Sequence, residues 1–214
     1  MNWRDRFSLI KDDPSRITSI YYFLAERINS RINGQRSPSE GHDVVAADWD
    51  TLLLLDGCRQ DLFESTNNLP GKLSSVRSRG SFSKEYLQRN FVGKDLQDTV
   101  YVTANPYADI LEGEVFHNVI DVLSSDWDPN VGTVPPEIMR EKVQEAHNNY
   151  PNKRIIGHFM QPHYPFLGAT ANQLRQPGIA DSQKESESVP DIWRQLQFRF
   201  DGVSSDIVWK AYRE

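Results

Sequence analysis

A run of leucines at positions 52–55, followed at once by an aspartate, constrains the fold of this chain more than any other stretch. An apolar run without polar alternation is typical of a strand that is buried on both faces of a parallel sheet. Further β-type runs at 99–103, 114–123 and 153–160 alternate with helical patterns at 59–65 and 134–151. This alternation predicts an α/β fold, in which helices sandwich a mostly parallel sheet.

Two of the predicted helices carry start signals. The helix after residue 134 begins with two prolines, which suit a helix N-terminus. Its apolar positions near one face are Ile138, Val143 and Ala146. The last helix begins after residue 201, where Ser204 or Ser205 would cap it. Its apolar positions are Val203, Ile207, Val208, Ala211 and Tyr212.

The chain divides into an N-terminal segment, 1–43, and an α/β domain, 44–214. Apolar residues recur at helical spacing over 15–32, which predicts an amphipathic helix that packs on the domain or on a partner. These residues are Ile17, Ile20, Tyr21, Leu24, Ile28 and Ile32. A polar, turn-rich linker follows at 33–43. Residues 169–191 are also polar and predict a surface excursion or a disordered loop.

Composition narrows the functional classes. The chain has 24 Lys and Arg against 30 Asp and Glu, a net charge of −6, so we expect no nucleic-acid partner. No apolar run approaches the roughly 20 residues of a membrane span, and the charged N-terminus does not resemble a signal peptide. Cys58 is the single cysteine, so no internal disulfide can form. These features together favour a cytoplasmic protein.

Asp56 is the first candidate site residue. In open parallel sheets, ligands bind outside the carboxyl ends of the strands, and Asp56 directly follows the leucine run. A carboxylate at such a position can hold a divalent metal. It can equally cap the next helix, near Arg59. Position alone does not choose between these interpretations.

The stretch "SRGSFSKEYL", residues 78–87, holds the second candidate. Gly80 permits a tight turn, after which Ser81 or Ser83 would lie at a helix N-terminus. Free backbone N–H groups there favour an anion and would help a serine act as a nucleophile. Arg77 and Arg79 could add positive charge. The alternative is that Ser83 only caps the helix.

Two histidines in "RIIGHFMQPHYPFLG", residues 154–168, are the third candidate. His158 lies inside the strand pattern, where a hydrogen-bonded core histidine is the alternative to a place at the site. His163 lies between Pro162 and Pro165 in a rigid loop. An imidazole there could donate to a substrate oxygen or protonate a leaving group.

In this order, "LLLLDGCRQDLF", "SRGSFSKEYL" and "GHFMQPHYPFLG" resemble the N-terminal portion of sulfatase-like proteins of the alkaline phosphatase superfamily, in a haloarchaeal-type form. The resemblance covers roughly residues 49–168. It implies a large parallel α/β sheet and metal-assisted hydrolysis or transfer of phosphate or sulfate esters. It also implies roles for three residues: Asp56 as ligand of a divalent metal (Zn, Mn, Mg or Ca), Ser83 as nucleophile and His163 at the substrate. Arg79, Ser81 and His158 are then expected to bind the anionic ester substrate.

Two departures from the family pattern matter. Ser83 is followed by Lys84 and Glu85, so the Cys/Ser-x-Pro-x-Arg signature of true sulfatases is absent, which favours phosphatase or phosphotransferase chemistry. The family's later Asp-His metal motif is also missing, because the sequence ends at Glu214. We therefore expect an incomplete sheet at the C-terminus and doubtful activity. The alternatives are a non-catalytic binding or scaffold protein and a partner chain that completes the sheet.

Overall fold

The computed structural model describes residues 41–111, 114–174, 176, 192 and 204–214 of the 214-residue chain. The amphipathic helix predicted over 15–32 lies outside the described residues. Along the chain the principal elements are β1 (Thr51–Leu55), α3 (Gln60–Thr66), α4 (Ser83–Asn90), β2 (Leu96–Thr103), η2 (Ala108–Ile110), β3 (Phe116–Asp121), α5 (Val122–Ser125), α6 (Pro136–Asn149), β4 (Arg154–Phe159), η3 (Ala169–Gln173) and α8 (Ser205–Arg213). Among the described residues, no helix has the length and apolar character that crossing a bilayer requires.

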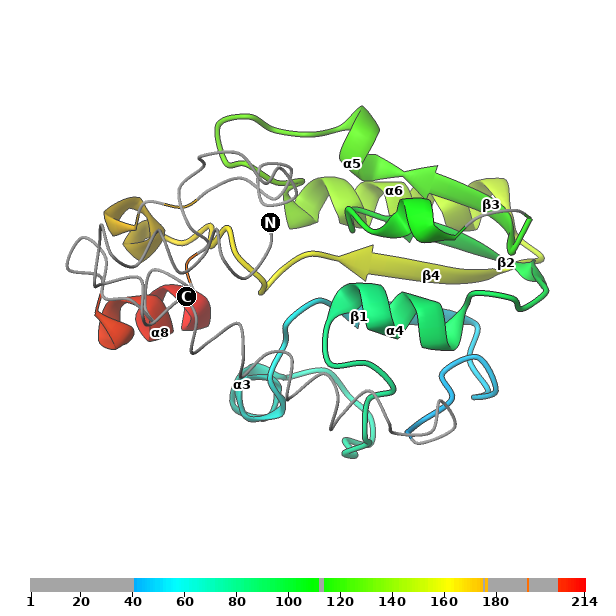
Figure 1. Cartoon of the computed structure of the whole chain (residues 1–214), viewed down its shortest axis with the longest axis horizontal. Helices are drawn as coiled ribbons and strands as arrows, with labels where there is room; N and C mark the ends of the chain where they lie inside the picture. Colours follow the sequence, from blue (N-terminus) through cyan, green and yellow to red (C-terminus); the bar gives the residue numbers. More distant parts are fainter. Residues whose placement is uncertain (1–40, 112–113, 175, 177–191, 193–203) are drawn as a thin grey trace, which may run out of the picture. The chain divides into compact units, whose positions relative to one another are not determined.

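The strands form one parallel sheet in the order β1-β4-β2-β3 (Figure 1). The prediction of an α/β fold with a parallel sheet is therefore confirmed. His158 in β4 pairs with Leu54 of β1 on one side and with Thr103 of β2 on the other. Because every strand runs in the same direction, the residues that follow them meet at one edge of the sheet, where ligands bind in such folds.

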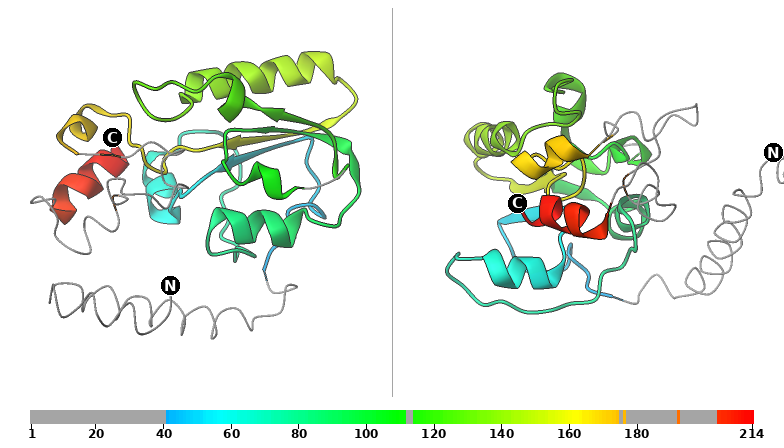
Figure 2. Two further views of the ribbon diagram at one scale, coloured as in Figure 1. Left: turned by 45° about the horizontal axis from the view of Figure 1, so that its top comes forward. Right: turned by 90° about the vertical axis from the view of Figure 1, so that its left-hand side faces the viewer.

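Helices cover both faces of the sheet (Figures 1 and 2). Successive side chains of a strand point to opposite faces, so each strand contributes to two cores. One core joins α6 to β2 and β4 through Val100, Val102, Ala104, Val122, Val134, Met139, Val143, Ala146, Ile155 and Met160. The other joins α4 to the opposite face through Leu87, Phe91, Leu96, Tyr101, Leu111, Val115, Phe116 and Ile156.

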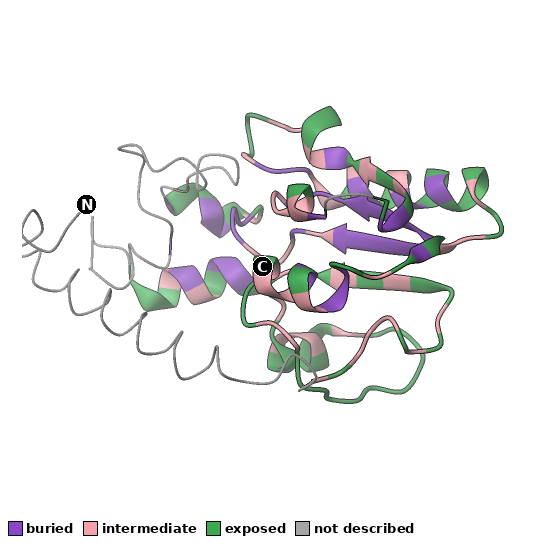
Figure 3. Ribbon diagram, turned by 45° about the vertical axis from the view of Figure 1, so that its right-hand side comes forward, coloured by how far each residue is buried: buried purple, intermediate pink, exposed green. Residues whose placement is uncertain are grey.

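The prediction that the leucine run is buried on both faces is wrong. β1 is an edge strand whose residues alternate between exposed and partly buried, and Leu53 and Leu55 remain 53% and 40% exposed. Figure 3 shows this contrast with the buried strand β4. The reason lies in the packing: α6 lies against β4 and β2, whereas Leu52 and Leu54 face the core on the α4 side. An apolar run therefore specified a strand here, but not its place in the sheet.

Several boundaries also differ from the sequence predictions. The run 114–123 contains both β3 and α5, because the Asp121 side chain accepts a hydrogen bond from the backbone N–H of Ser124 and so caps a new helix. In α6, Val143 and Ala146 are buried as predicted, and Met139 joins them, whereas Ile138 is only partly buried.

The α8 helix packs with η3. Its N-cap is Ser204, whose hydroxyl accepts a hydrogen bond from the N–H of Ile207. Its buried side chains form a cluster with Tyr164, Phe166, Ala171, Leu174 and Ile192; they are Val208, Ala211 and Tyr212. The first part of the range predicted as a polar loop, Ala169–Gln173, is thus a packed 3-10 helix. Residues 175 and 177–191 lie outside the described residues.

Candidate functional site

Asp56 stands at the carboxyl edge of the sheet, as the sequence predicts. Its backbone N–H donates to the carbonyl of Phe159 at 3.0 Å, which extends the pairing of β1 with β4 by one residue. In the described structure the N-cap of α3 is Arg59, and no side chain caps that helix. The interpretation of Asp56 as a helix cap is therefore wrong.

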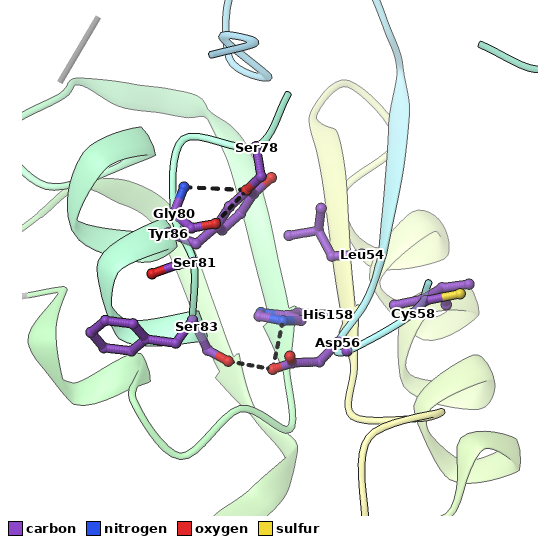
Figure 4. A pocket seen from close by; sticks show the side chains of 12 residues that line it. Leu54, Asp56, Cys58, Ser78, Gly80, Ser81, Ser83, Tyr86 and His158 are labelled. Carbon is purple, nitrogen blue, oxygen red and sulfur yellow. Dashed lines mark hydrogen bonds and ion pairs between the residues drawn. The ribbon is translucent and has the colours of Figure 1, made fainter. Parts of the chain in front are cut away.

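Three polar side chains converge on the Asp56 carboxylate, and Figure 4 shows two of them, Ser83 and His158. The Ser83 hydroxyl donates to Asp56 Oδ2 at 2.7 Å, and the Asn105 side-chain amide donates to the same oxygen at 2.8 Å. His158 Nε2 lies 3.7 Å from Oδ2, an ion-pair distance that is too long for a hydrogen bond. The structure thus brings together three residues singled out in the sequence, Asp56, Ser83 and His158, and adds Asn105.

These neighbours favour the charged form of Asp56. Burial of the carboxyl group raises its pKa, but the neighbouring His158 and the Ser83 hydroxyl together outweigh burial and hold the pKa below its ordinary value. A carboxylate that accepts several hydrogen bonds is stabilised in this way. Asp56 is therefore ionised at neutral pH.

The two candidate serines have different surroundings. Ser83 is the first residue of α4, and its hydroxyl turns to Asp56. Ser81 donates to Glu85 Oε2 through both its backbone N–H, at 2.7 Å, and its hydroxyl, at 2.8 Å. The N–H and the hydroxyl of Ser81 lower the pKa of Glu85, with help from the charge of Arg89, against the opposing effect of desolvation. Ser81 thus connects the loop that precedes α4 to the first turn of that helix, whereas the Ser83 hydroxyl points toward the Asp56 carboxylate.

Gly80 allows this loop to lie against α4. A Cβ atom at Gly80 would lie 2.4 Å from the backbone nitrogen of Tyr86. This distance is too short for two non-bonded atoms, so no residue with a side chain fits there. The glycine predicted for a tight turn is therefore required by a close backbone approach.

His163 lies beside the backbone of Asp56 and not beside its carboxylate oxygens. Its backbone N–H donates to the carbonyls of Asp56, at 3.0 Å, and Met160, at 2.9 Å. Gly57 has φ +68°, and a Cβ there would lie 3.3 Å from His163 Cβ. His163 Nδ1 lies 2.7 Å from the carbonyl oxygen of Tyr164. His163 is thus near the site and held by the loop on both sides.

Arg79 does not join the other site residues. Its guanidinium forms an ion pair with Asp43 at 3.0 Å, and its carbonyl accepts a hydrogen bond from Arg89. The side chain is 12% exposed. The contacts of Arg79 thus connect the loop to the start of the described domain.

A cavity of about 410 Å³ opens beside the Asp56 carboxylate. Its lining consists of Leu54, Leu55, Asp56, Gly57, Cys58, Ser78, Gly80, Ser81, Phe82, Ser83, Tyr86 and His158. Among the described residues that line it, none is lysine or arginine. Because Asp56 is ionised, an anionic ester in this cavity would meet a negative charge unless a cation lay between them.

The oxygen atoms beside the cavity are of the chemical type that binds divalent cations. Carboxylate and hydroxyl oxygens such as those of Asp56 and Ser83 are ligands for hard cations, and Mg²⁺ is often held by one or two carboxylates together with water and substrate oxygens. Within the described ranges, no group of three or more His, Cys, Asp and Glu side chains could hold a metal ion. Water and the ester would therefore have to supply the remaining ligands.

Sequence reasoning missed two residues of this site. Asn105 is 1% exposed and follows β2, so the rule that selected Asp56 at a strand end could have selected it as well. Tyr101 is fully buried, and its hydroxyl lies 2.6 Å from His158 Nδ1. It lies in the apolar run "VYV", where the sequence carries no signal of a polar role.

The chain matches no protein-family model, no curated protein and no solved structure. Its function must therefore be argued from its own residues.

Proposed function

We propose that this chain acts on phosphate or sulfate esters as a metal-dependent hydrolase or transferase, with Ser83 as its nucleophile. The observation that carries the proposal is the 2.7 Å hydrogen bond from the Ser83 hydroxyl to the ionised Asp56 carboxylate, beside an open cavity. The resemblance of three ordered motifs to sulfatase-like proteins of the alkaline phosphatase superfamily supports the same assignment. The missing sulfatase signature after Ser83 favours phosphate over sulfate.

In this proposal Asp56 and Ser83 hold the cation, and Asn105 keeps the carboxylate oriented. A bound divalent cation would neutralise the ester's negative charge and favour the alkoxide of a serine hydroxyl. Ser83 lies in the first turn of α4, where free backbone N–H groups and the helix dipole favour the anionic group.

The covalent step can be written in terms of this chain's residues. Ser83 Oγ forms a bond to phosphorus or sulfur while the bond from that atom to the alcohol oxygen breaks. With the cation held by Asp56 and Ser83, the Ser83 hydroxyl would release its proton to solvent, and the alcohol leaves with a proton from solvent. Water, or a second alcohol, then takes the group from Ser83.

Intact-mass spectrometry of the full chain tests the nucleophile. After incubation with p-nitrophenyl phosphate and Mn²⁺, wild type should carry a covalent phosphoryl adduct. The adduct should also form on Ser81→Ala, the matched control, but not on Ser83→Ala. An adduct that persists on Ser83→Ala would reject Ser83 as the nucleophile.

Calorimetric titration tests the cation. Metal-stripped wild type should bind Mn²⁺ or Mg²⁺ saturably, and Asp56→Asn should lose this binding. Asp61→Asn is the control. Asp61 is close to Asp56 in the sequence, but its carboxylate is exposed and is paired with Arg59, so its loss should leave the binding of the cation unchanged. Equal binding by wild type and Asp56→Asn would remove Asp56 from the proposed metal site.

A second candidate is a non-catalytic binding protein that keeps the cavity without turnover. The observation that favours it is the shortage of metal ligands, since no three-residue group occurs among the described residues. Saturable binding of Mn²⁺ or of inorganic phosphate without any covalent adduct would support this candidate over the enzyme.

A further inference from the structure

The two histidines of the 154–168 stretch are each held at Nδ1, but by different kinds of partner. His158 Nδ1 lies 2.6 Å from the hydroxyl of Tyr101, which can donate or accept. His163 Nδ1 lies 2.7 Å from the backbone carbonyl of Tyr164, which can only accept. The protons of the two rings can be assigned from these partners.

The Tyr101 hydroxyl fixes the proton of His158. Tyr101 is fully buried, so water does not reach its hydroxyl, and the hydroxyl proton needs an acceptor inside the protein.

His158 Nδ1 is the acceptor for that proton. Tyr101 is fully buried, and burial raises the pKa of its hydroxyl, so the hydroxyl keeps its proton. In the described part of the chain, His158 Nδ1 is the acceptor at hydrogen-bonding distance from it. Nδ1 of the neutral ring is then without a proton, and Nε2 carries the proton on the side that faces Asp56, 3.7 Å away.

His163 has the opposite arrangement. Because the Tyr164 carbonyl has no proton to give, Nδ1 of His163 must be the donor in this hydrogen bond. A neutral His163 then has its lone pair on Nε2. The backbone N–H of His163 donates to the carbonyls of Asp56 and Met160, which fixes the backbone that carries the ring.

We propose that His158 and His163 are held in opposite tautomers, His158 with its proton on Nε2 through Tyr101 and His163 with its proton on Nδ1 through Tyr164. The tautomers follow from the contacts alone. Their consequence for turnover rests on the proposed function. The Nε2 proton of His158 then faces the Asp56 carboxylate, 3.7 Å away, and Tyr101 is a positioning residue that acts through His158. Within the described part of the chain no hydrogen bond reaches His163 Nε2, so the neutral ring can accept a proton or bind a cation there and donates from Nε2 only as the imidazolium.

Long-range ¹H–¹⁵N spectra of the full chain, labelled with ¹⁵N at histidine and recorded at alkaline pH, read both tautomers at once. His158→Gln and His163→Gln assign the two rings. In wild type we expect a proton-bearing Nε2 in His158 and a proton-bearing Nδ1 in His163. The reverse assignment for either ring, or the same tautomer in both, would overturn the proposal, and it is read in the wild-type chain.

Tyr101→Phe then tests the positioning role. It should move His158 toward a mixture of tautomers and leave the spectrum of His163 unchanged, because the partner of His163 is a backbone carbonyl. Tyr86→Phe is the control, a partly buried tyrosine that lines the cavity beside Asp56, and it should alter neither ring. An unchanged His158 in Tyr101→Phe would remove Tyr101 as the cause.

Activity separates this inference from the proposed function. If esters are turned over, Tyr101→Phe should lower kcat about tenfold with little change in KM, as expected for the loss of one hydrogen bond that supports the transition state. An unchanged kcat would reject the positioning role. Wild type that forms no adduct and turns over no ester would reject the proposed function and leave the tautomers standing.

Discussion

Replacing Asn105 with alanine removes the side-chain amide that the structure places on the Asp56 carboxylate. The amide donates to Asp56 Oδ2 at 2.8 Å, and its oxygen accepts the backbone N–H of Tyr107 at 2.9 Å. A hydrogen bond to a charged group contributes about 1.5–3 kcal/mol, and a neutral one about 1 kcal/mol. Because Asn105 is only 1% exposed, water cannot readily replace either bond. We expect Asn105→Ala to lower the free energy of unfolding by about 2.5–4 kcal/mol.

Urea unfolding of the metal-stripped protein measures this loss, read from the midpoint at an unchanged m-value. Asn118→Ala is the matched control. Asn118 donates to the Tyr150 hydroxyl at 2.8 Å, a neutral partner, so its removal should cost about 1 kcal/mol. Equal losses for the two variants would contradict the argument that Asn105 acts on a buried charge.

A double-mutant cycle with Asp56→Asn locates the effect. If the Asn105 amide acts through the carboxylate, the two substitutions should couple by about 1–2 kcal/mol, within the range measured for residues in contact. Additive losses of stability would mean that the Asn105 amide does not act through the Asp56 carboxylate, which would contradict its assignment to the site.

Three further predictions follow from other contacts. The pKa of Asp56 lies below its ordinary value of 3.8, so its ionised form stabilises the fold above about pH 3.8, and this contribution is lost as the pH falls through the lower pKa of the folded chain. The stability advantage of wild type over Asp56→Asn in urea, with a chelator present, should therefore shrink in acid, and a constant difference would refute the shift. Arg79→Ala breaks the ion pair with Asp43 and should cost about 1 kcal/mol of stability while the KM for the ester stays unchanged; a raised KM would restore the predicted substrate role. Gly157→Ala would place a Cβ 2.7 Å from Val143 Cγ2 and should cost about 1–3 kcal/mol in thermal or urea unfolding, and the second substitution Val143→Ala should recover part of it. No recovery would point to a backbone effect of Gly157 instead of the contact.

Local patterns were enough to predict most of the secondary structure. The apolar runs predicted the four strands, and the prolines before α6 and the serine before α8 marked helix starts, because these signals act within a few residues. The run 114–123 was divided differently, since a cap at Asp121 ends β3 and begins α5. The exposure of Leu53 and Leu55 could not be predicted from an apolar run. It depends on which strand lies at the edge of the sheet, a question of long-range pairing.

At the site, local sequence patterns were enough to identify the side chains that follow the strands and those that open a helix, among them Asp56 and Ser83. Which of these side chains meet depends on how the strands pair. The order β1-β4-β2 places Asn105 and His158 at Asp56, and it places Tyr101 behind His158. The tertiary structure also distinguishes Ser83, which donates to Asp56, from Ser81, which donates to Glu85; the sequence pattern of a helix start does not distinguish these two serines. The physical reason is that capping and periodicity act within one turn or one strand, whereas the hydrogen bonds of this site join residues that are 27 to 57 positions apart.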